Sequence, residues 1–314
     1  QAEDGIRDRS PSRGLGDVYK RQVLNGDLSS AVFQVGANAN QTITATTGNF
    51  STTKYGNYRI GAIAATATTT TGDLTIGTTA GSLASTATAN TSRVAGGAVT
   101  INGALGSATI TVAATSTAKA AATLINGKTD ITGVRATART ELDLTALTTA
   151  TSFNISLTSD NTTAVSLAFT VGAANDADGL AAAITAFNDK SSSTGVTAKL
   201  NDAGTGITVT NETGSNIKIA FTTGAATVGA VGIASGSSAT ITGQLTLDSD
   251  KSFGVIAANT TDFFVTAGES AKLQSVNNVD VSSADAATRT LAMVDSALSA
   301  INGQRAKFGA LQSR

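Results

Sequence analysis

The hydrophobic positions near the end of the chain follow a heptad rhythm. Steps of four and three residues alternate from Ala287 to Phe308, which is the spacing of a helix that packs along one narrow line against other helices. This line, called the helix seam below, consists of Ala287, Leu291, Val294, Leu298, Ile301, Arg305 and Phe308. Ser282 and Asp285 form a capping-box pattern just before it. The pattern therefore predicts a helix over about residues 283–310 that needs partner helices.

The middle of the chain contains an internal repeat. An Ala-rich helical stretch over 116–126 is followed by Thr-Gly-Val, and a second over 175–188 is followed by the same three residues, 62 positions later (195 − 133 = 62). Each stretch has strand patterns before and after it, so the sequence predicts two ββ-α-ββ units in tandem. The predicted repeat-turn residues are Asn126, Gly133, Val134, Asn188, Gly195 and Val196. The alternative is two unrelated α+β modules that share a common turn.

Elsewhere the pattern is extended and interrupted by turns. Phe33, Val35 and Ile43 alternate with polar residues, which predicts a hairpin within 23–60. Residues 61–95 are rich in Ala, Thr and Ser, with one strand pattern at 73–76. Residues 239–256 alternate as a returning hairpin, and 263–265 read as a buried strand.

The amino-acid composition excludes several classes of catalytic and metal site. The chain has no His, no Cys and no Trp, which excludes His-dependent nucleophiles, His or thiolate zinc sites and disulfides. The net charge of −1 gives no basic footprint for nucleic acid. We find no apolar run long enough to cross a membrane and no cleavable signal peptide. The sequence predicts no enzyme, no cofactor and no metal site, although Asp248 and Asp250 leave a weak cation site open.

Two local patterns have simpler explanations than ligand binding. Gly127-Lys128-Thr129 lacks the earlier glycine of a phosphate-binding loop, because Ala122 stands there. The acidic run 175–179 fails as a calcium loop, because a twelve-residue loop with Gly179 sixth would begin at Ala174 and end at Thr185, and neither is a carboxylate. We expect Asn175, Asp176 and Asp178 to cap a helix instead.

The first residues differ from the rest of the chain. Residues 1–22 contain nine charged residues and the single proline. We interpret them as a non-native or disordered tail and leave them out of the fold prediction.

Three motifs together resemble bacterial flagellin. The final stretch resembles the C-terminal helix of the flagellin D1 domain, and residues 24–26 and 33–38 resemble the segment that follows its N-terminal helices. The repeat resembles the "IN" motif of flagellins and hook-associated proteins, with a degenerate second copy. The matching positions of the final stretch are Asp295, Ala297, Leu298, Arg305, Gly309, Ala310, Gln312 and Arg314.

The resemblance implies a structural subunit of the extracellular flagellar filament, which serves motility. Its partners would be other flagellin subunits in a homopolymer, an export chaperone and a cap protein, with no nucleic acid and no membrane. The chain would be a fragment without the terminal D0 helices. A hook-filament junction protein and a surface adhesin or glycan-binding module are the alternatives.

The predicted fold class is a multidomain α+β protein with a discontinuous helical D1-like core, a β-hairpin, and β-rich outer domains that contain short Ala-rich helices. The predicted segments are 1–22 (tail), 23–60 (first part of the core), 61–150 (first repeat module), 151–238 (second repeat module), 239–270 (returning β segment) and 271–314 (C-terminal core helix).

Overall fold

The computed structural model describes residues 30–34, 41–46, 48–61, 83–85, 94, 96–228, 231–257, 263–264, 268–281 and 284–312. Helices and antiparallel strands in several sheets make this a mixed α+β protein, as predicted. The chain divides into two compact units. Unit 1 combines residues up to Tyr58 with those from Leu273 onward, and unit 2 runs from Arg59 to Lys272. The predicted strand at 73–76 lies outside the described residues.

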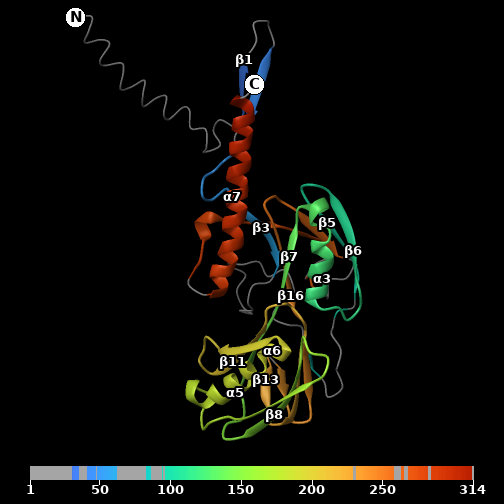
Figure 1. The fold of residues 1–314 in the computed structure, drawn as a ribbon, viewed down its shortest axis with the longest axis vertical. Coiled ribbons are helices and arrows are strands. Elements are labelled where there is room, and N and C mark those ends of the chain that lie inside the picture. Colours follow the sequence, from blue (N-terminus) through green and yellow to red (C-terminus); the bar gives the residue numbers. More distant parts are fainter. Residues whose placement is uncertain are drawn as a thin grey trace, which may run out of the picture. The chain divides into compact units, whose positions relative to one another are not determined.

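Unit 1 contains one hairpin and one long helix (Figure 1). The hairpin pairs Phe33 with Ile43, and the chain returns through an edge strand and a short 3-10 turn before the helix. The elements are β1 (Ser30–Gln34), β2 (Thr42–Thr46), the start of β3 (Gly56–Gly61), β19 (Lys272–Ser275), η1 (Val276–Asn278) and α7 (Ala284–Gln312). Helix α7 has 29 residues.

Unit 2 holds both repeats. The first repeat consists of β5 (Gly97–Asn102), β6 (Ser107–Val112), α3 (Ala118–Asn126), α4 (Thr129–Thr132) and β7 (Arg135–Thr145). The second begins with β8 (Ser152–Thr158), β9 (Val165–Thr170), α5 (Ala177–Asp189), α6 (Ser191–Thr194), β10 (Val196–Leu200) and β11 (Gly206–Asn211). Further strands are β4 (Leu83–Ser85), β12 (Ile217–Thr223), β13 (Ala226–Val228), β14 (Val231–Ile233), β15 (Ser238–Ile241), β16 (Gln244–Ser249), β17 (Gly254–Ala257) and β18 (Gly268–Ser270).

The second repeat is nested inside the first. Strand β7 pairs with β16 along 135–139 and with β11 along 140–145. Strand β17 then pairs with β5 and β18, so the sheet of the first repeat is completed only after the second repeat has ended. The predicted hairpin over 239–256 is therefore wrong. Its first strand, β15, pairs with β12 and β4, whereas β16 belongs to another sheet. Alternation alone indicates strands but not which strands pair.

Apolar packing is strongest in the second repeat. Phe153 stacks on Phe169 with ring centroids 5.2 Å apart, and Phe221 meets Phe153 edge-on at 6.3 Å. Helix α5 packs on β9, β10 and β11 through its buried residues Leu180, Ala183 and Phe187. In the first repeat, α3 packs on β7, β16 and β6 mainly through alanines, as the Ala-rich pattern suggests (Figure 1).

Two local predictions are confirmed in part: the burial of residues 263–264 and the capping of helix α5. Phe263 and Phe264 are buried, but neither lies in a strand, and Val265 lies outside the described residues. Helix α5 is capped by Asp176, whose carboxylate accepts from the N–H of Gly179 at 2.8 Å. Asn175 instead donates to the carbonyl of Leu147, so it ties the helix start to the connection between β7 and β8.

Candidate functional site: an exposed helix seam and two repeat turns

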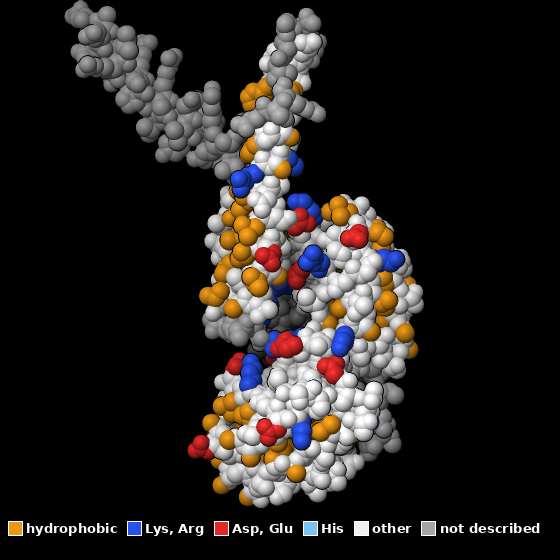
Figure 2. Space-filling model, viewed as in Figure 1, with side chains coloured by type: hydrophobic (Ala, Val, Ile, Leu, Met, Phe, Trp, Pro, Cys, Tyr) orange, Lys and Arg blue, Asp and Glu red, His pale blue; other side chains and the backbone are white. Residues whose placement is uncertain are grey.

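The predicted helix seam lies largely on the exposed side of α7. Leu291 is 62% exposed, Leu298 51% and Val294 40%. Ala287 and Arg305 are also exposed, and Ile301 and Phe308 are half-buried. Figure 2 shows hydrophobic side chains in a band along this helix. An apolar band of this length on a single helix is typical of a surface that meets another helix.

A second stripe of α7 is buried, and sequence reasoning missed it. Its members lie on a different line of the helix from the seam residues: Ala286, Met293, Ala297 and Gln304. Gln304 donates to the carbonyl of Thr46 at 3.2 Å, and Thr290 donates to the carbonyl of Asp280 at 2.7 Å. These contacts attach the helix to the rest of unit 1 and leave the seam outward. The predicted capping residue Ser282 lies outside the described residues.

The first repeat turn is built on a reciprocal side-chain clamp. Asn126, at the end of α3, donates to the carbonyl of Ala136 and accepts from its N–H, both at 2.8 Å. Thr132 accepts from the N–H of Val134 at 3.2 Å. Between them Gly133 has φ of 72°, in the left-handed region that favours glycine. The Asn side chain thus pairs with a strand backbone as another strand would.

The second repeat turn has the same contacts 62 residues later. Asn188 donates to the carbonyl of Ala198 at 2.9 Å and accepts from its N–H at 2.8 Å. Thr194 accepts from the N–H of Val196 at 3.2 Å, and Gly195 has φ of 69°. Val134, directly before β7, and Val196, the first residue of β10, are both fully buried. The predicted turn residues therefore come together in two separate clusters, one in each repeat.

The two turns differ in what lies over the glycine. A Cβ on Gly133 would meet the side chain of Leu105 at 3.4 Å. A Cβ on Gly195 would overlap the carboxylate of Asp160. Leu105 and Asp160 thus occupy corresponding places, one in each repeat, and Leu105 is 72% exposed.

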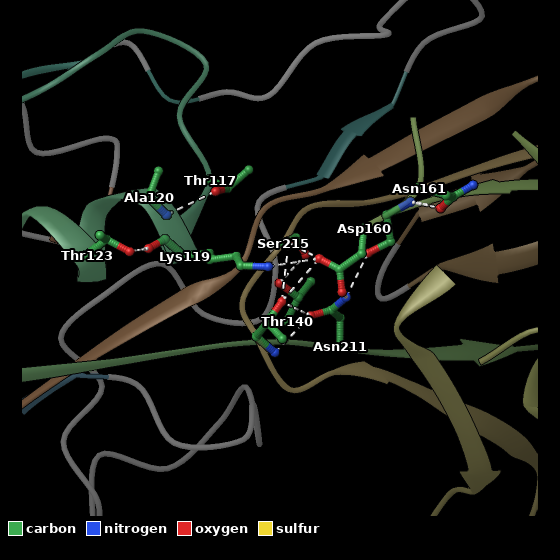
Figure 3. Close-up of polar contacts among 11 residues, drawn as sticks. Thr117, Lys119, Ala120, Thr123, Thr140, Asp160, Asn161, Asn211 and Ser215 are labelled. Carbon is green, nitrogen blue, oxygen red and sulfur yellow. Dashed lines mark hydrogen bonds and ion pairs between the residues drawn. The ribbon is translucent and has the colours of Figure 1, made fainter. Parts of the chain in front are cut away.

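Asp160 joins the two repeats, and no sequence pattern pointed to it. Figure 3 shows its carboxylate between α3 of the first repeat and the segment after β11 of the second. Oδ1 accepts from Ser215 at 2.6 Å and from Lys119 at 3.2 Å, and Oδ2 accepts from Asn211 at 3.1 Å. Nearby, Thr140 donates to the carbonyl of Ser215 at 2.7 Å. The three partners of Asp160 are 41 to 55 residues away from it in the sequence, so only the folded topology reveals the cluster.

Several effects set the pKa of Asp160. Burial raises it, whereas the hydrogen bonds from Ser215, Asn211 and Lys119 and the charge of Lys119 lower it. The net result is a pKa below the ordinary value of 3.8. Asp160 is therefore a carboxylate at neutral pH and acts as a structural acceptor.

Other polar candidates are occupied by structural contacts. Asp248 pairs with Arg59 at 2.7 Å, where the Arg59 side chain is 3% exposed. Within the described parts of the chain, no group of three or more His, Cys, Asp or Glu side chains could hold a metal ion. In the same parts, no helix combines the length and apolar character needed to span a membrane.

The structural repeat coincides with a known sequence family. Residues 98–161 match the family described as the flagellin hook IN motif. This match covers the first repeat as far as the start of the second, and includes the first repeat turn.

A longer similarity extends beyond the repeat. The chain is 35% identical over 224 residues to the B-type flagellin of Pseudomonas aeruginosa. The alignment covers 65% of this chain and 44% of that flagellin, so it spans less than half of the relative. Neither match favours the junction-protein or adhesin alternatives. Together they confirm the resemblance that the terminal and repeat motifs indicate, and this chain is similar to the bacterial flagellins.

Proposed function

We propose that this chain is a structural subunit of the bacterial flagellar filament, with no catalytic activity, and that it serves motility outside the cell. The relationship to flagellins supports the role. The exposed helix seam is the one observation that supports a mechanism, because apolar residues in heptad spacing on one helix fit the contacts that build helical assemblies. Other flagellin subunits are the proposed partners, together with a chaperone and a cap protein by family analogy.

The proposed assembly step is the burial of the helix seam against helices of the same or a neighbouring subunit. Burying a Leu or Val side chain contributes roughly 1.5–3 kcal/mol relative to leaving it exposed. Leu291, Val294 and Leu298 lie in consecutive turns of α7 and are all exposed, so their burial would act along one continuous line. Contacts that do not close on themselves generate a fibre rather than a ring.

A co-assembly experiment tests this function. Labelled chain is mixed with monomers of B-type flagellin during growth on filament seeds, and the label in pelleted filaments is measured. We expect incorporation of the unaltered chain and at least a tenfold loss with the double substitution Leu291→Lys and Leu298→Lys, roughly the effect of losing one buried apolar side chain. Ser299→Lys, which adds a charge at an exposed position of the same helix, is the matched control.

The negative outcomes are distinct. Label that never enters filaments contradicts the filament role. Label that enters equally with and without the seam substitutions contradicts assembly through the seam and leaves the family role in place.

A further inference from the structure

Strand β6 of the first repeat is an open sheet edge. In the described part of the chain its sheet runs β18-β17-β5-β6, and β5 is the only strand that pairs with β6. Figure 1 shows β6 at the outer margin of this sheet. Its inner face is covered, because Ile110 and Val112 are buried and both α3 and α4 contact the strand. The free feature is thus the backbone edge, not an apolar face.

The turn before β6 defines which backbone groups point to the open side. The N–H of Gly103 donates to the carbonyl of Gly106 at 2.9 Å. Antiparallel pairs alternate between hydrogen-bonded and non-hydrogen-bonded residues, so the backbone groups of Ala108 and Ile110 face β5. The residues whose N–H and C=O groups face away from β5 are Ser107, Thr109 and Thr111.

The usual protections of an edge strand are missing here. Natural edges are commonly protected by charged side chains, proline or a bulge. Residues 94–118 contain no charged residue and no proline, and β5 and β6 pair without a register shift. The outward side chains of β6 are Ser and Thr, and Thr109 shares a 2.8 Å hydrogen bond with Thr100 on β5. Nothing in this segment repels a second strand.

We propose that β6 is a self-association edge, at which β6 of a second copy of this chain pairs in antiparallel orientation about a two-fold axis at Thr109. In that register Ser107 of one copy lies opposite Thr111 of the other. In this register odd-numbered residues of one copy lie opposite odd-numbered residues of the other. The polar side chains therefore stay on one face of the joined sheet, and Ile110 and Val112 on the other. The absence of charge matters most for a like-with-like contact, in which any charge would face its own copy.

The register also gives a partner to an exposed apolar residue. Leu105 is four residues before Thr109, so it lies opposite Ala113 of the second copy, four residues after Thr109. Leu105 is 72% exposed and Ile131 beside it is 48% exposed. A Cβ on Gly106 would lie 3.7 Å from Cγ2 of Ile131, which places the two side chains at the same end of β6. Pairing would cover this end.

A two-fold contact closes on itself. It would join first repeats in pairs and would not lengthen a fibre, so it is independent of the proposed assembly through the helix seam. An experiment must keep the two contacts apart, since both could associate copies of the chain.

Sedimentation equilibrium of the whole chain carrying Leu291→Lys and Leu298→Lys tests the edge alone. In this background we expect a monomer–dimer equilibrium. Thr109→Lys should lower the association constant by about tenfold or more. Thr109→Val should leave the association constant unchanged. Like Thr109→Lys, it removes the hydrogen bond to Thr100, but it adds no charge and leaves the backbone edge intact. Ala168→Lys is the matched control on β9, the edge strand of the second repeat, where Ala168 is also exposed.

A cysteine probe gives an independent readout. The chain has no cysteine, so Thr109→Cys under mild oxidation should yield a disulfide-linked dimer, and Ala168→Cys should not. Circular dichroism checks that each variant remains folded. Three results would overturn the proposal: a monomer at all concentrations in the seam-substituted background, a dimer that Thr109→Lys leaves unchanged, or a dimer that Ala168→Lys abolishes.

Discussion

The two repeats of unit 2 share one turn and differ in their surroundings. Asn126 and Asn188 clamp the strand that follows with the same pair of hydrogen bonds, 62 residues apart. Yet the residue before the first Asn is Ile125, and the residue before the second is Phe187. Both are fully buried. The comparison teaches that the polar clamp and the left-handed glycine define this turn, whereas the neighbouring apolar residue only has to fill its core.

The repeats diverge where they face other parts of the chain. Asp160 of the second repeat accepts from Lys119 of the first, but Leu105, at the corresponding place in the first repeat, is exposed. One copy uses this position for an internal contact, and the other leaves it open. Four substitution experiments can break or sharpen this comparison.

Removing the clamp should have the largest effect, and the effect should be equal in both repeats. Asn126→Ala and Asn188→Ala each leave a buried N–H and C=O without a partner, on Ala136 or Ala198. Each should lower the free energy of unfolding by about 3 kcal/mol, measured by urea denaturation. Asn102→Ala, which loses an exposed hydrogen bond with Ser107, should cost less than about 0.5 kcal/mol. A large inequality between the two clamp variants would contradict a shared role.

Adding a methyl group at the glycines should separate the repeats. Both residues have positive φ, so Gly133→Ala should cost about 1 kcal/mol of unfolding free energy. Gly195→Ala should cost about 2 kcal/mol or more, because its Cβ also displaces the hydrogen-bonded carboxylate of Asp160. Equal costs would show that Asp160 moves aside freely.

The contact between the repeats should depend on the buried acceptor more than on the ion pair. Lys119 has a side chain that is 50% exposed, so Lys119→Ala should cost about 0.5 kcal/mol. Asp160→Ala should cost about 2 kcal/mol, because Ser215 and Asn211 lose their acceptor. A double-mutant cycle of urea denaturation measures the coupling. If the coupling energy between Lys119 and Asp160 exceeded the loss of unfolding free energy caused by Asp160→Ala alone, the ion pair would matter more than the buried acceptor, and the prediction would be wrong.

The smallest effect is the pH dependence of this carboxylate. Because the pKa of Asp160 is lowered on folding, its stabilisation is fully present above the ordinary value of 3.8 and is lost as pH falls through the folded pKa. The stability difference between the unaltered chain and Asp160→Asn should therefore shrink below about pH 4. In the Lys119→Ala background, this stability difference should depend slightly less on pH, because the charge of Lys119 contributes to the lowered pKa of Asp160. A difference that grows on acidification would reverse the sign and refute the assignment.

Local patterns predict much of unit 2 and the course of α7. The Ala-rich stretches are helices, the Thr-Gly-Val runs follow them, and the strands flanking them were visible from alternation. Heptad spacing predicts a helix over the seam residues but says nothing of the buried stripe at Met293 and Gln304. This stripe is weak in the sequence because one large apolar residue, Met293, stands among alanines and a glutamine.

The contacts that the sequence could not reveal join segments that are far apart along the chain. Asp160 meets Lys119 and Ser215 only because the nested topology brings three distant segments together. The separation of β15 from β16 into different sheets has the same origin. Strand partners depend on the whole fold, and a single sequence carries little information about them.

The shared strand β7 has a practical consequence for dissecting the protein. A piece cut at the limits of the family match, 98–161, would keep β7 but lose β16, the strand that pairs with residues 135–139. Such a piece would carry an unfinished sheet, prone to recruit foreign strands. The smallest segment that retains β16 and every strand of the sheet β18-β17-β5-β6 runs from Gly97 to Ser270, and it contains the second repeat.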